Sequence, residues 1–105
     1  MNIRMQYLYR DAGNYKQWGE VIFKNRRGSS PAALEDQVRS LLIDQDFFEA
    51  EVLNIPTLYF DEPISDLDRQ WHEFHSLEAC EDAATDRTDR DIEELLNLLQ
   101  SIKRN

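Results

Sequence analysis

The chain has 105 residues, of which 41% are hydrophobic and 31% charged, and this is enough for one compact domain with one apolar core. Its formal net charge of −9 at pH 7 repels phosphate groups, so no nucleic-acid binding is expected. No apolar stretch approaches the ~18 residues that cross a bilayer, and we expect no membrane-spanning helix.

Two strands are predicted at the start of the chain. The first strand covers residues 3–9 and the second covers residues 18–23, and the turn residues Asp11, Gly13 and Asn14 lie between them. Because the connection is short, we expect the two strands to be antiparallel neighbours. In the first strand, polarity alternates over residues 3–9 and places one set of side chains on a single face: Ile3, Met5, Tyr7 and Tyr9.

The first helix is predicted to begin after Ser30 and to end near Asp44. Ser30 can accept a hydrogen bond from the first-turn amides, and Pro31 suits the first helical position because its missing N–H is not needed there. A single apolar stripe follows at helical spacing: Leu34, Val38, Leu41 and Leu42.

The middle of the chain has a weaker pattern. Residues 46–55 are rich in hydrophobic side chains but show no clean period, and residues 57–60 predict a short strand after Pro56. Residues 61–70 predict an acidic loop. Residues 71–77 predict a further strand, with alternate side chains on one side: Trp71, Glu73, His75 and Leu77.

The end of the chain predicts a mobile acidic linker over residues 78–87 and then a second helix. Thr88 is the expected N-cap, with Asp89 and Asp91 in the first turn. The buried stripe of this helix is expected to be Ile92, Leu95, Leu96, Leu99 and Ile102. The sequence therefore predicts a single α+β domain over residues 1–105, with a small antiparallel sheet, two helices packed on it and the approximate order β-β-α-β-β-α.

No motif in the sequence predicts a catalytic residue, a metal site or a cofactor, and an enzyme is not indicated. His72 and His75 are the only histidines, and on a strand residues three apart point to opposite faces. The zinc-protease pattern His-Glu-x-x-His is absent, because the sequence reads His-Glu-Phe-His. Cys80 has no basic neighbour in the sequence that would stabilise a thiolate, and we do not expect it to act as a nucleophile.

Several separated segments nevertheless resemble a family of small uncharacterised bacterial proteins with no established activity. They are Tyr7-x-Tyr9-Arg10-Asp11-x-x-Asn14-Tyr15-Lys16, Val21-x-Phe23, Phe47-Phe48-x-Ala50, Ile55-Pro56-x-Leu58 and Trp71-His72-Glu73-Phe74. The resemblance implies that one recurring surface contains Arg10, Asp11, Asn14, Tyr15 and Lys16 beside Trp71, His72 and Glu73. A purely structural interpretation is also open, in which Asp11 and Asn14 shape a turn and Arg10 pairs with Glu73.

The leading functional hypothesis is a non-catalytic acidic module that binds an unidentified protein partner or regulates one. Its surface would be a polar and aromatic patch around residues 10–18 and 71–75, with Trp18 as an added aromatic anchor.

Two alternatives stay open. Residues 61–94 carry thirteen acids and three arginines, which allows an inhibitor that mimics nucleic acid and blocks a DNA-handling or phage-defence enzyme. That inhibitor needs one acidic surface built from Asp61, Glu62, Asp66, Asp68, Glu78, Glu81 and Asp82. The other alternative is a metal-dependent hydrolase that uses His72 and His75.

The compartment and the oligomeric state are predicted from the same features. A single cysteine and the lack of a secretory signal at the N-terminus favour the bacterial cytoplasm. The edges of so small a sheet allow a homodimer.

Overall fold

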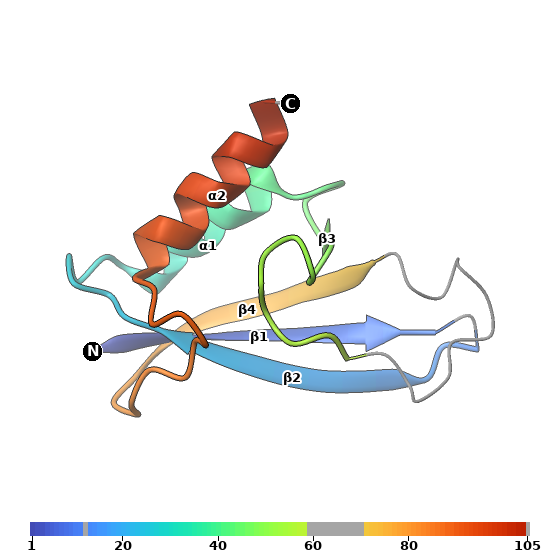
Figure 1. Cartoon of the computed structure of the whole chain (residues 1–105), viewed down its shortest axis with the longest axis horizontal. Coiled ribbons are helices and arrows are strands. Elements are labelled where there is room, and N and C mark those ends of the chain that lie inside the picture. Colours follow the sequence, from blue (N-terminus) through green and yellow to red (C-terminus); the bar gives the residue numbers. More distant parts are fainter. Residues whose placement is uncertain (12, 59–70, 105) are drawn as a thin grey trace.

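The computed structural model describes residues 1–11, 13–58 and 71–104, and in this part the chain is an α+β protein with a four-stranded antiparallel sheet and two helices. The strand order is β2-β1-β4-β3. Both helices lie on the same side of the sheet (Figure 1). The elements in chain order are β1 (Asn2–Arg10), β2 (Lys16–Phe23), α1 (Pro31–Leu41), β3 (Phe47–Phe48), β4 (His72–Cys80) and α2 (Ile92–Arg104).

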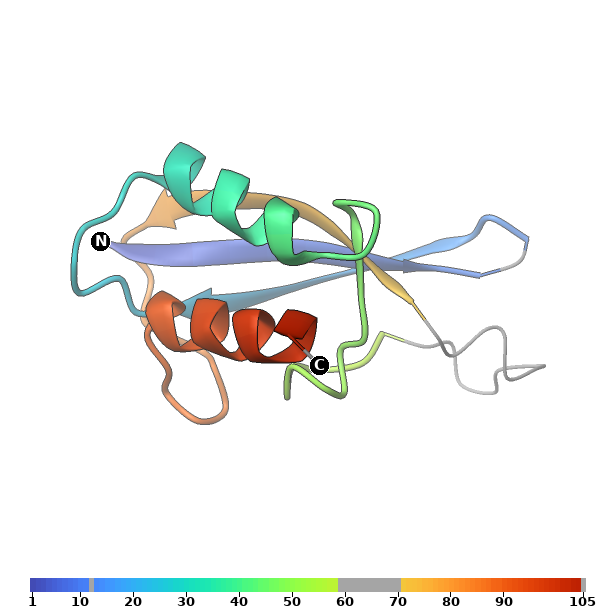
Figure 2. The ribbon, with the colours of Figure 1, turned by 90° about the horizontal axis from the view of Figure 1, so that it is seen from above.

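The core lies between this face of the sheet and the two helices, which run side by side above it (Figure 2). The sheet contributes Ile3, Met5 and Tyr7 from β1, each at most 1% exposed. The helix stripes predicted from the sequence supply most of the other layer, since the buried helical residues are Leu34, Val38, Ile92, Leu95, Leu96 and Leu99. The prediction was wrong for Ile102 in the last turn of α2, which is 40% exposed.

The strand β4 contains a bulge that the sequence does not predict. Gln6 of β1 pairs with Ser76, while the next residue, Tyr7, pairs with Phe74, so His75 is an extra residue in β4. The extra residue reverses the alternation of faces. The predicted face with Trp71, Glu73, His75 and Leu77 together is therefore wrong, because the buried side chains are His72 and Phe74 before the bulge and Leu77 after it.

The third strand differs from the predicted one. The short strand that pairs with β4 is Phe47–Phe48, whereas Thr57 and Leu58 are not in a strand. The position of this strand is determined by the pairing of Phe47 with Glu73, which is distant in the sequence. The local alternation of side chains does not reveal such a pairing. Residues 59–60 of the predicted strand and the predicted acidic loop 61–70 lie outside the described residues.

The boundaries of the helices differ by a few residues from the predicted ones. Helix α1 ends at Leu41 and not near Asp44, because Leu42 has extended backbone angles (φ −89°, ψ 161°), and Asp44 and Gln45 further on have positive φ values of 51° and 65°. Helix α2 begins at Ile92, and the carboxylate of Asp91 accepts a hydrogen bond from the Glu93 amide, so Asp91 takes the capping role expected of Thr88.

The segment predicted as a linker, residues 78–87, begins inside the sheet. Residues 78–80 belong to β4 and pair with β1. Further along, the amides of Thr85 and Asp86 both donate to the carbonyl of Ile22 in β2. This segment is therefore hydrogen-bonded to the sheet at both of its ends.

No helix in the described part of the chain is long and apolar enough to cross a membrane.

Candidate functional site

The surface predicted from the sequence lies at the end of the sheet where β1 turns into β2 and β4 begins. The Arg10 guanidinium donates to both carboxylate oxygens of Glu73, at 3.0 and 3.2 Å, and to Oδ1 of Asn14 at 2.7 Å. The pairing of Arg10 with Glu73 is therefore as the structural interpretation predicts. These charges satisfy one another, which leaves little free hydrogen-bonding capacity for a partner.

Asp11 and Asn14 shape the turn between the two strands. The Tyr15 amide donates to the Asp11 carboxylate at 2.9 Å, and the Asn14 amide donates to the Asp11 carbonyl. Asn14 has a φ of 67°, a conformation that asparagine tolerates better than most residues. The two residues are thus explained by the backbone of the turn.

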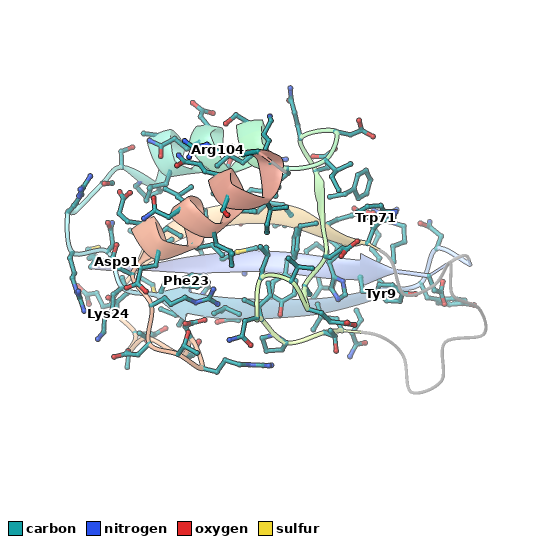
Figure 3. The ribbon with its side chains drawn as sticks, turned by 45° about the horizontal axis from the view of Figure 1, so that its top comes forward. Tyr9, Phe23, Lys24, Trp71, Asp91 and Arg104 are labelled. Atoms are coloured by element: carbon teal, nitrogen blue, oxygen red, sulfur yellow. The ribbon has the colours of Figure 1, made fainter. Side chains whose placement is uncertain are left out.

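Three aromatic side chains are among the exposed residues of this surface. Tyr15 is 72% exposed, Trp18 is 52% exposed and Trp71 is 39% exposed. The Trp18 ring meets the His75 ring edge to face, with centroids 5.0 Å apart. Trp71 lies at the end of the sheet far from Lys24 and Asp91, which sit together at the start of α2 (Figure 3). Lys16 is also exposed here, as the first residue of β2.

His72 does not belong to this surface, because its side chain is fully buried in the core. Its Nε2 accepts a hydrogen bond of 2.9 Å from the Leu58 amide, and the rings of Tyr7, Tyr9 and Phe48 surround it. Burial lowers the pKa of His72 to about 4. The imidazole is therefore neutral at pH 7 and has a structural role.

The two histidines do not converge on a common point. His72 points into the core, whereas His75 is exposed and contacts Trp18 on the opposite face of the sheet. Within the described residues, no three histidine, cysteine or acidic side chains are placed to hold a metal ion together. The geometry gives no support to a metal-dependent hydrolase centred on these residues.

Part of the acidic half of the sequence is neutralised by Arg4, whose guanidinium bridges Glu20, Glu78 and Asp82 on the open face of the sheet. Of the acids required for a nucleic-acid mimic, Glu78 and Asp82 therefore carry a counter-charge, and Glu81 is exposed. The remaining members of that set lie outside the described residues: Asp61, Glu62, Asp66 and Asp68.

Another ion pair fixes the loop before α2. Asp86 accepts hydrogen bonds from the Arg90 guanidinium at 2.8 and 2.9 Å, and both residues are buried. Burial alone raises the pKa of Asp86, but the hydrogen bonds from Arg90 and Thr88 lower it to about 2 overall. The Arg90 guanidinium also lies over the Phe23 ring, which ties this loop to β2.

An apolar cavity of about 160 Å³ lies near the C-terminal ends of the two helices. Its lining residues come from the end of α1, the strand β3, the following residues 49–53 and the last turns of α2. It opens to solvent, and three exposed aliphatic residues lie on its rim: Ile43 at 48%, Val52 at 47% and Ile102 at 40% exposure. Deeper in the cavity the lining residues include Leu42, Phe48, Leu53 and Leu99.

The segment that forms one wall of the cavity contains backbone that most side chains avoid. Asp44, Gln45 and Asn54 all have positive φ, between 51° and 65°. Asp44 and Gln45 form a tight turn that is closed by two hydrogen bonds between the backbones of Ile43 and Phe47. Such conformations cost free energy and gather at sites of function. Here they hold Ile43 at the rim.

The same wall is acidic. Residues 43–52 contain four acids and no lysine or arginine. Asp46 is paired with Arg39, while the described residues offer no ion-pair partner to Asp44, Glu49 or Glu51. Of these acids, Glu49 lines the cavity itself, so an apolar interior adjoins an acidic segment of the chain.

Sequence reasoning missed this cavity because three segments far apart in the chain build it. One sequence feature points to it: residues 46–55 carry many hydrophobic side chains without the period of a helix or a strand. Not all of these side chains are needed in the core, and the exposed Val52 is one that remains at the surface.

Comparisons of this chain with protein-family models, with curated proteins and with solved structures find no match. The resemblance to small bacterial proteins stays a prediction.

Proposed function

We propose that this protein is a non-catalytic protein-binding module that takes one apolar side chain of a basic partner segment into the cavity between α1, β3 and α2. The observation that carries the proposal is the apolar cavity with three exposed aliphatic residues on its rim. Isolated exposed aliphatic residues are ordinary, but a cluster around a concavity is typical of an interaction site.

The size of the cavity limits its occupant. A cavity of about 150 Å³ accommodates a group as large as a benzene ring, and the cavity here is about 160 Å³. One leucine, isoleucine or phenylalanine side chain therefore fits. Insertion of such a side chain also covers Ile43, Val52 and Ile102, and full burial of one large apolar side chain contributes roughly 1.5–3 kcal/mol.

The acidic segment beside the cavity determines which residues of the partner can flank that side chain. Asp44, Glu49 and Glu51 attract lysine or arginine residues that flank the apolar anchor, and they disfavour acidic segments. The net charge of −9 acts in the same direction at longer range. The partner is thus a segment with one large apolar residue and basic neighbours.

Selection from a random peptide library tests this function. Peptides selected on the wild-type protein are expected to share a large apolar residue with lysine or arginine beside it. They are expected to lose binding to Val52→Glu, which places a charge at the rim, and to keep binding to the matched control Tyr15→Glu at the other end of the sheet. Peptides that bind both variants equally would contradict the proposal.

The aromatic surface around residues 10–18 and 71–75 is the second candidate for contact with a protein. The exposure of Tyr15, Trp18 and Trp71 favours it, because aromatic side chains are frequent anchors of interfaces. His72 is left out of this candidate because it is buried. Selected peptides that bind Val52→Glu but not Tyr15→Glu would assign the binding to this surface.

A further inference from the structure

Along β2, the main-chain N–H and C=O groups of every second residue point away from β1, toward the outer edge of the sheet. The Ile22 amide donates to Oγ1 of Thr85, and the Ile22 carbonyl accepts from the amides of Thr85 and Asp86. The Ile22 groups therefore point away from β1. Strand groups alternate in direction along the chain, so the groups of Glu20, Trp18 and Lys16 point to the same outer edge.

As far as the structure describes the chain, one half of this edge is covered and the other half is open. Beyond Ile22, the backbone of Lys24 pairs with Arg90 and Ile92. Over residues 16–20, by contrast, the described residues provide no main-chain partner for the outer groups. An open edge of this kind is a template for another strand, and natural proteins usually block it.

The opposite side of the sheet is protected. The strand there, β3, has two residues, and side chains of α1 cover the adjoining edge of β4. The Leu77 amide donates to the Glu35 carboxylate, and the Arg39 guanidinium donates to the carbonyl of His75. Residues 16–20 are thus the part of the described sheet edge that can accept a strand.

We infer that two copies of this chain pair through residues 16–20 of β2, so that their sheets join into one antiparallel sheet. A two-fold axis at Trp18 places this residue opposite the partner's Trp18. In that register Lys16 lies opposite the partner's Glu20, and Glu20 lies opposite the partner's Lys16. The partner is therefore a second copy of the chain, and the edge is complementary to itself.

Charge selects this register. Lys16 is exposed and has no ion pair within the described residues, and the Glu20 side chain is 50% exposed with Oε2 bound to Arg4. A shift of two residues in one direction places Lys16 opposite the partner's Trp18. A shift in the other direction places Lys16 opposite the partner's Ile22, whose edge groups are already bonded to Thr85 and Asp86. The register with Trp18 at its centre therefore pairs both charges and uses only open groups.

The side chains agree with this arrangement. Lys16, Trp18 and Glu20 alternate with Gln17 and Gly19 and so share the face of the sheet that is turned away from the helices. On that face the two half-exposed Trp18 rings become cross-strand neighbours and cover one another. On the helix side, Leu58 of the same chain packs against Gly19, so the pairing of the two side-chain rows concerns only the face turned away from the helices.

This inference is independent of the proposed function, since the apolar cavity borders β3 at the other edge of the sheet. The dimer carries two cavities, and a partner with two suitable segments would bind it with increased avidity.

Sedimentation velocity over a wide range of protein concentration tests the dimer. The wild type is expected to convert from monomer to dimer as the concentration rises. Lys16→Glu and Glu20→Lys each bring like charges together twice across the axis, and each is expected to weaken self-association about tenfold or more. An equimolar mixture of the two variants restores both opposite-charge pairs and is expected to dimerise like the wild type.

A wild type that stays monomeric at all concentrations would overturn the inference, and so would a mixture that does not associate. Because Glu20→Lys also removes a contact to Arg4, circular dichroism must show that it folds. If Glu20→Lys does not fold, Trp18→Pro is measured in its place, together with Lys16→Glu. Proline removes the outward N–H at the axis without removing a bond to β1, so it is expected to abolish the dimer. The exposed control Arg27→Glu is expected to leave association unchanged.

Discussion

The Leu58 amide donates a hydrogen bond of 2.9 Å to Nε2 of His72, and this bond attaches the segment after β3 to the start of β4. The acceptor nitrogen carries no proton, so the imidazole is neutral and its proton is on Nδ1. A buried neutral histidine makes the stability of the protein dependent on pH.

The pH dependence has a definite sign. Burial lowers the pKa of His72 in the folded state to about 4, whereas the unfolded state keeps about 6.5. The unfolded chain therefore binds a proton first as pH falls. The contribution of His72 is complete above pH 6.5 and is lost between 6.5 and 4, by roughly 3 kcal/mol at most. Urea unfolding at several pH values measures this loss. His72→Gln is expected to flatten the dependence, whereas a flat wild-type curve or an equal effect of His75→Gln would contradict the assignment.

Gly19 and Leu58 are predicted to be coupled. A Cβ added at Gly19 would lie 2.7 Å from Cδ2 of Leu58 and 3.0 Å from its Cδ1. Gly19→Ala is therefore expected to reduce the free energy of unfolding by about 1–3 kcal/mol. In Leu58→Ala the obstacle is gone, so Gly19→Ala is expected to cost much less in that background. Additive effects in the double-mutant cycle, measured by chemical denaturation, would contradict the predicted contact.

The buried pair of Asp86 and Arg90 is predicted to be essential for stability. Asp86→Asn leaves the buried guanidinium without its counter-charge, which typically costs about 3–5 kcal/mol. The matched control is Asp89→Asn, because Asp89 is paired with Lys24 but is largely exposed, and about 0.5 kcal/mol is expected there. Thermal unfolding compares the two variants, and equal losses would show that Asp86 has no special role.

The same pair predicts a second acid-sensitive range. Hydrogen bonds from Arg90 hold the pKa of Asp86 at about 2 in the folded state, below the ordinary 3.8. Its contribution to stability is present above pH 3.8 and is lost as pH falls toward 2. This range lies below that of His72, so acid unfolding of His72→Gln is expected to retain a transition at low pH. In a double variant with Asp86→Asn that dependence is expected to disappear.

The regular elements were predictable from local sequence because their patterns are local. The alternation of Ile3, Met5 and Tyr7 fixes one face of β1, and Ser30 with Pro31 fixes the start of α1. In α2, the apolar stripe beginning at Ile92 likewise identifies the buried face before any tertiary contact is known.

The remainder depends on contacts between distant parts of the chain. The bulge at His75 appears only when β4 pairs with β1, and the burial of His72 follows from that pairing. The strand at Phe47 exists because Glu73 lies opposite it. In the candidate sites, the pairing of Arg10 with Glu73 was predictable from their charges, whereas the cavity depends on the packing of three separate segments.

The most direct test of the proposed function is a methyl-resolved NMR titration with matched short peptides. One peptide has a central leucine flanked by lysines, a second has alanine in place of the leucine, and a third has glutamates in place of the lysines. The account predicts that the first peptide alone shifts the methyl signals of Leu53, Leu99 and Ile102, and that Val52→Glu removes these shifts. Equal shifts with all three peptides, or shifts confined to residues near Trp18, would contradict it.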